Sequence, residues 1–282
     1  MSPDTEFPGG GEAKRTLSLL WSRQRPPTRG PKPGLSVDSI VAAAIELADA
    51  EGLGALSMRR VADRLGVGTM SLYTYVPAKA ELLDLMVDAV FGEHAEALQT
   101  IDDGRAASAW RATVETQARA GWDLYLRHPW MLHVASTRSV LGPNEMTVFE
   151  LALRAFVGLG LSGRHMLAAT SLVSTYVRGA ARAAAEAVEA PKATGKTDTE
   201  WWLERAPLLD EMEVFDPERF PTVIAVGEDG GYDVSSTENE YMLQYAIDDF
   251  EFGLQRVLDG LAAFIDARAA KASTSRRRSR ST

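Results

Sequence analysis

The feature that most constrains the fold is the spacing of apolar residues over 238–270, near the end of the chain. Apolar side chains recur there at steps of four and three residues, at Leu243, Ile247, Phe250, Leu254, Val257, Leu261 and Phe264. A period of about 3.5 residues is typical of helices that pack along a seam. Shorter helical patterns cover 36–52, 58–65, 108–127, 144–159 and 163–190. No segment shows the sustained two-residue alternation of a strand, so we predict an all-α fold.

Two short helical segments meet at a tight corner within residues 57–75. Ser57 can cap a helix over 58–65, Gly66 can end it, and Val67 can fill the turn before a second helix at about 70–75. This arrangement predicts a helix-turn-helix, although an ordinary helical corner would look similar. The second helix would turn Leu72 inward and expose Thr69, Met70, Ser71, Tyr73, Thr74 and Tyr75. Hydroxyl, thioether and phenol groups suit phosphates, base edges and thymine methyl groups, which favours DNA binding.

The wider stretch 40–94 resembles the tetracycline-repressor family of bacterial transcription regulators. The resemblance rests on the order and spacing of Ser57-Met58-Arg59-Arg60-Val61-Ala62, Leu65-Gly66-Val67, Leu72-Tyr73-x-Tyr75-Val76 and Lys79-Ala80-Glu81-Leu82-Leu83-Asp84. Further along, Phe250-Glu251-Phe252-Gly253-Leu254 and Gly260-Leu261 are similar to the final helix of the core domain of tetracycline repressors, and Thr137-Arg138 falls at a Thr-Arg pair of that domain.

The resemblance implies a homodimer that binds a palindromic operator in double-stranded DNA, with its recognition helix in the major groove, and that responds to a small-molecule effector. Carried over residue by residue, the implied DNA contacts are Arg59, Thr69, Met70, Ser71, Tyr73, Thr74, Tyr75 and Lys79. Tyr73 and Lys79 match the family in type and are expected to contact phosphates. Thr69, Thr74 and Tyr75 replace the Gln, Trp and His of tetracycline repressors, so we expect a different operator sequence.

Charge is spread unevenly along the 282 residues. Residues 1–33 carry a net charge of +3 and residues 271–282 carry +5. Because the whole chain carries −9, residues 34–270 carry −17. We expect a disordered basic arm over 1–33 and a disordered basic tail over 271–282, which either keep the chain soluble or contact polyanions. Between them we expect a helix-turn-helix domain over 34–94 and a ligand-binding and dimerisation domain over 95–270, with a long loop over 191–237 that has room for one short helix.

The head itself is acidic, because residues 34–95 contain four cationic side chains against nine carboxylates. That balance is unusual for a DNA-binding domain. The local positive charge must come from Arg59, Arg60, Arg64 and Lys79. The arm adds Arg23, Arg25, Arg29 and Lys32, which could reach the minor groove or the phosphates.

Candidate ligand contacts lie on segments expected to enclose the larger domain: Gln117, Trp122, Trp130, His133, Arg138, Phe149 and Tyr176. The aromatic members fit a plain core equally well. The chain has no cysteine, and its four histidines lack a metal-ligand spacing, so we expect neither a metal site nor a cofactor. Tetracycline repressors bind a magnesium–drug chelate through histidines; here His94 lies one residue short of one such position, and Val134 occupies the other. We therefore expect a sizeable, largely apolar effector.

A ligand-responsive repressor is thus the leading prediction. A ligand-blind DNA-binding regulator or activator is the first alternative. A helical enzyme using Asp102-Asp103 or Asp248-Asp249 is less favoured, because adjacent helical residues point about 100° apart and rarely converge on one ion. We expect no catalytic residues. With no apolar run of about 18 residues and no secretory signal core at the N-terminus, we expect a cytoplasmic protein without a membrane segment.

Overall fold

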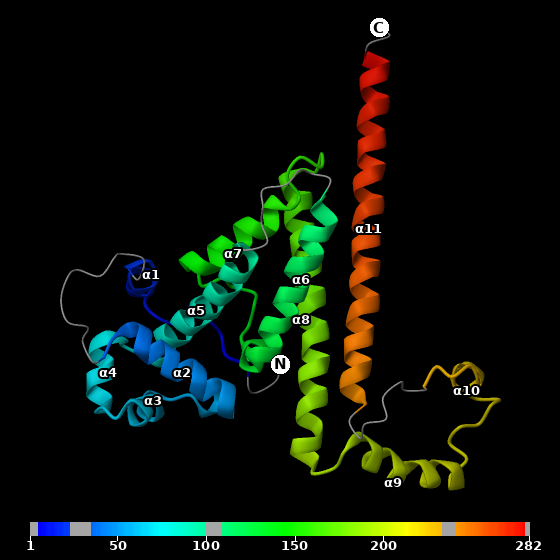
Figure 1. The fold of residues 1–282 in the computed structure, drawn as a ribbon, viewed down its shortest axis with the longest axis horizontal. Helices are drawn as coiled ribbons and strands as arrows, with labels where there is room; N and C mark the ends of the chain where they lie inside the picture. Colours follow the sequence, from blue (N-terminus) through cyan, green and yellow to red (C-terminus); the bar gives the residue numbers. More distant parts are fainter. Residues whose placement is uncertain (1–4, 23–34, 100–108, 233–240, 280–282) are drawn as a thin grey trace. The chain divides into compact units, whose positions relative to one another are not determined.

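The computed structural model describes residues 5–22, 35–99, 109–232 and 241–279 and confirms the all-α class (Figure 1). Its helices are α1 (Ala13–Ser22), α2 (Val37–Glu51), α3 (Met58–Leu65), α4 (Thr69–Tyr75), α5 (Lys79–Gln99), α6 (Trp110–Arg127), α7 (Pro143–Arg154), α8 (Gly163–Thr194), α9 (Asp198–Glu211), α10 (Pro221–Glu228) and α11 (Met242–Ser279). Short 3₁₀ helices η1 (Leu53–Ala55) and η3 (Pro129–His133) link them.

The chain divides into two compact units. The first unit is Met1–Arg178 with Arg256–Thr282, and the second is Gly179–Gln255. Among the described helices, none is both long and apolar enough to cross a membrane.

Helices α2, α3 and α4 form a three-helix head whose boundaries follow from local chemistry. Ser36 and Ser39 cap α2 reciprocally, and the Ser57 hydroxyl accepts a hydrogen bond from the Arg60 backbone N–H at the start of α3. Gly66 ends α3 with a φ of 68°, a conformation that side chains disfavour. The Val67 N–H then returns to the Ala62 carbonyl at 3.0 Å, which closes the turn before α4. The predicted helix-turn-helix is confirmed at these positions.

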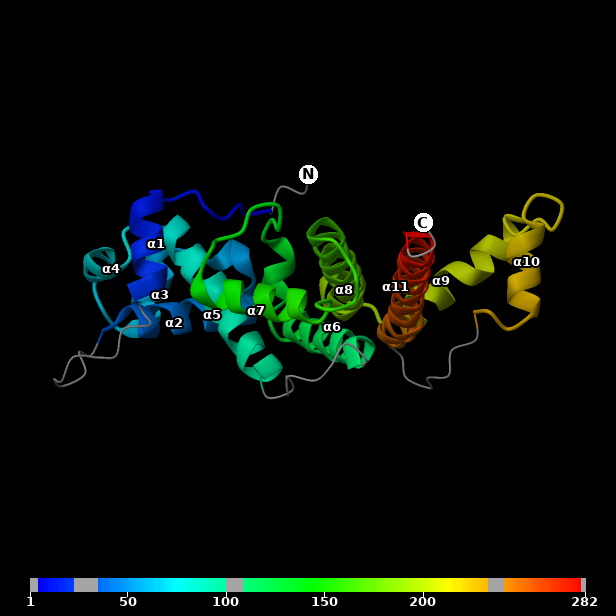
Figure 2. The same cartoon turned by 90° about the horizontal axis from the view of Figure 1, so that it is seen from above.

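Helix α5 belongs to the core of the head and also to the rest of its unit. Leu82, Leu85 and Met86 are fully buried in an apolar cluster that includes α2, α3 and α4. The same cluster continues to Leu124 of α6 and Trp130 of η3. Helix α5 also packs against α7, α6 and α1 (Figures 1 and 2). The head therefore shares its apolar core with α5, and moving α5 away would expose that core.

A buried carboxylate joins α5 to α7. Asp88 is 2% exposed, and its Oδ1 accepts hydrogen bonds from the backbone N–H groups of Asn144 and Glu145, both at 3.0 Å. The Asn144 side-chain amide donates back to the Asp88 carbonyl and Oδ2. Because the first N–H groups of a helix lack partners within it, Asp88 caps α7 from a neighbouring helix.

The second unit differs from the sequence prediction. The expected long loop over 191–237 is wrong for most of its length, because α8 continues to Thr194 and two further helices, α9 and α10, follow. The signal for α9 is a capping box, in which the Thr197 side chain accepts from the Glu200 N–H and the Glu200 carboxylate accepts from the Thr197 N–H. Neither α9 nor α10 buries a residue. Helix α9 therefore depends on local capping more than on packing.

The apolar stripe of α11 is shifted from its predicted register. The structure buries Phe250, Leu254, Leu258, Leu261 and Ile265. The expected stripe was right at three of these positions, whereas Val257 is only half-buried and Phe264 is 40% exposed. A straight helix has about 3.6 residues per turn, so a strict 3.5-residue spacing drifts off the buried face.

Both ends of the chain also differ from the expected disorder. Within the predicted arm over 1–33, residues 5–22 are ordered and include α1, whose Leu20 is fully buried. The arm cations Arg23, Arg25, Arg29 and Lys32 lie outside the described residues. Over the predicted tail at 271–282, helix α11 continues as far as Ser279. Leu19 and Leu20 pack α1 against the apolar cluster of the head, a signal that the basic composition of the arm obscured.

The cap at α7 gives a stability prediction. Asp88→Ala leaves two buried N–H groups without an acceptor, so we expect the free energy of unfolding to fall by about 1–3 kcal/mol. Asp88→Asn keeps an acceptor oxygen and is expected to lose less. Urea denaturation measures both, with Asp123→Ala, a change at an exposed helical carboxylate, as the control. Equal stability of the Asp88→Ala and Asp123→Ala proteins would contradict the capping role.

Candidate nucleic-acid interface and ligand cavity

Helix α4 presents polar and soft apolar side chains on its free face. Met70 is 77% exposed and Tyr73 is 41% exposed, while Leu72 is fully buried. Ser71 and Thr74 are exposed as well. The expectation of free side chains was wrong at two positions, because Thr69 is half-buried and Tyr75 is half-buried against the apolar cluster of the head. The surface that α4 offers is therefore centred on Met70, Ser71, Tyr73 and Thr74.

The three arginines of the head and Lys79, at the start of α5, all lie close to carboxylates. Arg60 pairs with Glu51 at 2.5 Å and Arg64 pairs with Glu46 at 2.8 Å, so both tie α3 to α2. Arg59 lies 3.9 Å from Asp63 on its own helix, and Lys79 lies 2.7 Å from Glu6. The side chain of Arg59 is 85% exposed, the most exposed of the four. Each of these cations is thus paired with a carboxylate of the chain itself.

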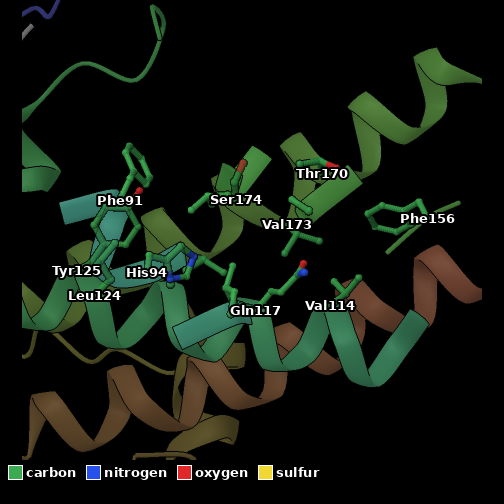
Figure 3. Close-up of a pocket in the computed structure, with 16 residues that line it drawn as sticks. Phe91, His94, Val114, Gln117, Leu124, Tyr125, Phe156, Thr170, Val173 and Ser174 are labelled. Atoms are coloured by element: carbon green, nitrogen blue, oxygen red, sulfur yellow. The ribbon is translucent and has the colours of Figure 1, made fainter. Parts of the chain in front are cut away.

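A cavity lies within the first unit, between α5, α6, α7 and α8 (Figure 3). It encloses about 140 Å³. Its lining residues are Phe91, His94, Leu98, Val114, Gln117, Ala118, Gly121, Leu124, Tyr125, Val148, Ala152, Phe156, Thr170, Val173, Ser174 and Val177. None of these side chains is a carboxylate, a lysine or an arginine. The cavity therefore suits a neutral, largely apolar molecule.

A few neutral polar groups could orient such a molecule. His94 is 8% exposed, and burial, assisted by the charge of Arg127, lowers its pKa to about 4. The side-chain amide of Gln117 donates to the Leu151 carbonyl at 3.1 Å, which fixes its direction. The Thr170 hydroxyl is buried and has no hydrogen-bond partner among the described residues. Buried polar groups normally have partners, so this hydroxyl is a candidate contact for a polar atom of a ligand.

The predicted ligand contacts are not gathered in this cavity. Of the seven, Gln117 lines it. Trp130 instead packs in the core, and its indole donates to Asp49 at 2.8 Å. Arg138 borders a smaller cavity of about 70 Å³, which shares Phe91 and Tyr125 with the larger one.

The remaining four lie elsewhere in the first unit. Trp122 is buried outside the cavity lining, and His133 is exposed. Phe149 directly follows the lining residue Val148, and Tyr176 directly precedes the lining residue Val177. One residue along a helix turns a side chain by about 100°, which is enough to miss a cavity.

Sequence reasoning missed most of the lining, although a signal was present. The lining residues of α6 follow helical steps from Val114 through Gln117 and Gly121 to Leu124, and those of α8 run from Thr170 to Val177. Small and polar residues interrupt an otherwise apolar face on both helices. Such interruptions leave space and hydrogen-bonding groups where a solid core would have neither.

The groups considered for metal or enzyme chemistry do not assemble. The described residues contain no cluster of three His, Asp or Glu side chains able to hold a metal ion. Asp248 and Asp249 are exposed on α11, and Asp248 accepts a hydrogen bond from Gln244. Asp102 and Asp103 lie outside the described residues.

Comparison with known proteins identifies the architecture. Residues 40–86 match the family described as bacterial regulatory proteins of the tetR family. Residues 104–265 match the tetracyclin repressor-like C-terminal domain. The chain belongs to the tetracycline-repressor family. It is accordingly a DNA-binding transcriptional regulator and not an enzyme.

Individual relatives of this tetracycline-repressor-family protein agree over most of the chain. The HTH-type transcriptional repressor DrrR1 of Streptomyces coeruleorubidus is 44% identical over 265 residues, covering 94% of this chain and 91% of its own. Among solved structures, ligand-free ActR of Streptomyces coelicolor has a TM-score of 0.61 at 26% identity and covers 84% of this chain and 99% of its own. ActR in complex with actinorhodin has a TM-score of 0.63 at 28% identity, covering 81% of this chain and 96% of its own.

The low pKa of His94 gives a pH prediction. The pKa is about 4 in the folded protein, against about 6.5 in the unfolded chain. Below pH 6.5 the unfolded chain therefore binds a proton that the folded protein does not bind. The free energy of unfolding is highest above pH 6.5 and decreases as the pH falls toward 4. We expect this group to lower the free energy of unfolding by about 2 kcal/mol between pH 7 and pH 5. His94→Gln, which cannot titrate, should lose that part of the pH dependence in urea melts. His133→Gln removes an exposed imidazole and is the control; identical profiles for both variants would refute a buried neutral His94.

Proposed function

We propose that this regulator is a repressor that binds a palindromic operator as a homodimer and is released from it by a neutral, largely apolar small molecule. The observation that carries the proposal is the double role of α5. Its first half is buried in the core of the DNA-binding head, and Phe91, His94 and Leu98 in its second half line the cavity. A change at the cavity therefore acts on a helix from which the head cannot separate.

The size of the cavity supports coupling between the two sites. Sites for drug-sized ligands are about 300–1,000 Å³, whereas this cavity encloses about 140 Å³. A larger effector must displace walls of the cavity, and α5 is one of them. An effector favours release only if it binds the DNA-incompetent conformation more tightly. The need for the cavity to widen gives a structural reason for the effector to bind the DNA-incompetent conformation more tightly.

The chemistry of the lining defines the effector class. Aromatic walls at Phe91, Tyr125 and Phe156 suit a flat ring system, and His94, Gln117 and Thr170 suit hydroxyl or carbonyl oxygens. ActR, solved in complexes with actinorhodin and with (S)-DNPA, supports a small-molecule effector for this chain as well. The alternative of a ligand-blind regulator gives no role to a cavity with a buried, unpartnered hydroxyl.

The proposed homodimer is supported by apolar residues that the single chain leaves exposed. Leu167 and Leu172 on α8 and Phe264 on α11 are all at least 40% exposed. Large apolar side chains grouped on long helices mark protein–protein contacts. A two-fold axis through such helices would pair two heads with the two halves of a palindrome.

The first test concerns DNA recognition by α3 and α4. Tyr73→Ala combined with Arg59→Ala removes a proposed phosphate contact and a proposed cationic contact to DNA, so we expect operator affinity and affinity for unrelated DNA to fall together. Thr74→Val should instead change the preferred sequence, because Thr74 lies on the exposed face of α4. Fluorescence anisotropy with an operator selected from random DNA measures both effects.

The control for this test is Tyr232→Ala, which removes a 57% exposed tyrosine outside the head. Its affinity for the operator should equal that of the native protein. Unchanged binding by the Tyr73→Ala, Arg59→Ala protein would mean that α3 and α4 do not contact DNA.

The second test concerns the effector. Val148→Trp fills the cavity from α7, so we expect operator release by the neutral probe 1,8-dihydroxyanthraquinone to need at least about tenfold more ligand, while operator affinity itself is kept. Phe149→Trp, on the neighbouring residue that points away from the cavity, is the matched control. Release should be the same with EDTA and with Mg²⁺. If release occurs only with tetracycline and Mg²⁺ and is abolished by EDTA, the neutral effector class is wrong.

A further inference from the structure

The ordered N-terminal segment, residues 5–22, is called the clasp below, and it lies against the first turns of α5. The Gly9 backbone N–H donates to Asp84 Oδ1 at 2.9 Å, and the Glu12 N–H donates to Glu81 Oε1 at 3.4 Å. Asp84 is fully buried and Glu81 is 3% exposed. Buried carboxylates require donors, and the clasp supplies them from its backbone. At Gly11 an added Cβ would lie 2.7 Å from the Glu81 side chain, so the fit is close.

The clasp is also bound to the segment that follows η3. The Glu6 N–H donates to the His133 carbonyl at 3.0 Å, and the Ala135 N–H donates to the Glu6 carbonyl at 2.9 Å. Near the other end of the clasp, the Trp21 indole donates to the Leu141 carbonyl at 3.1 Å. These contacts hold the backbone of Glu6 at a fixed place beside the start of α5.

The Glu6 side chain uses that position to reach Lys79. The distance from Glu6 Oε1 to Lys79 Nζ is 2.7 Å. The acids that pair with the three arginines of the head come from α2 and α3 themselves, whereas Glu6 comes from outside the head. Lys79 is the first residue of α5, directly after the α3–α4 motif, and is the proposed phosphate contact there.

We propose that the clasp regulates DNA affinity, because the Glu6 carboxylate competes with a DNA phosphate for Lys79. The inference rests on the proposed function, since it needs Lys79 to contact DNA. In the free protein the pair is neutral, so Lys79 contributes no net charge to the attraction of DNA. On the operator, the phosphate replaces the carboxylate, and the fixed backbone of Glu6 keeps the competitor close.

The experiment is operator binding by the full-length Glu6→Gln protein as a function of salt. Removing the competitor should tighten binding about two- to fivefold at low salt, the range expected for an exposed ion pair. The plot of log affinity against log salt concentration should become steeper, because the repulsion between the displaced Glu6 carboxylate and the DNA is strongest at low salt. Glu12→Gln removes an exposed carboxylate from the same clasp without touching Lys79, and it measures the general effect of that charge. If Glu6→Gln tightens binding no more than Glu12→Gln, the competition is wrong.

A second background separates this inference from the proposed function. Lys79→Met keeps the apolar stem of the side chain and removes the charge, and it should weaken operator binding. In that background, Glu6→Gln should lose most of its effect. An equal effect with and without Lys79 overturns the inference while leaving operator binding intact. An unchanged affinity for Lys79→Met would instead show that Lys79 does not contact DNA, which removes that residue from the proposed function too.

Discussion

The burial of α5 on several sides is the constraint on which the rest of the structure depends. Its apolar residues complete the core of the head, Asp88 caps α7, and Phe91, His94 and Leu98 form part of the cavity wall. Because packed interiors do not deform continuously, a helix held at so many points can move only together with the elements packed against it. Under the proposed function, a change in cavity size would reach the head through α5.

Electrostatics in the head follow a second principle, which is neutralisation within the chain. Arg60 and Arg64 are committed to α2, so they stabilise the head more than they attract DNA. In the proposed function, DNA recognition is left to Arg59, to Lys79 and to the polar face of α4. A regulator that must leave its operator when an effector binds gains from moderate affinity, because a small coupling free energy then suffices for release. The pairing of Lys79 with Glu6 fits that requirement.

The cavity avoids net charge in a different way from the head. Its lining has no charged side chain, and burial keeps His94 neutral at physiological pH. The proposed effector would bind there through apolar burial, with hydrogen bonds to a few fixed groups for orientation. The family resemblance alone would have suggested a metal chelate, whereas the residues that face the cavity favour a neutral ring system. Family membership and effector class are thus separate questions, decided by different parts of the chain.

The sequence by itself determined the helical class, the helix-turn-helix and most helix boundaries. Ser57, Gly66 and Val67 sufficed for the corner, because capping and a left-handed turn are local properties of a few residues. Only the tertiary structure decided which side chains meet. Val148 faces the cavity and Phe149 does not, which depends on how α7 is rotated against α5. Glu6 lies beside Lys79 because its backbone pairs with residues 133–135, more than a hundred positions away. Such contacts arise from packing between distant segments, and the periodicity of one segment carries no information about them.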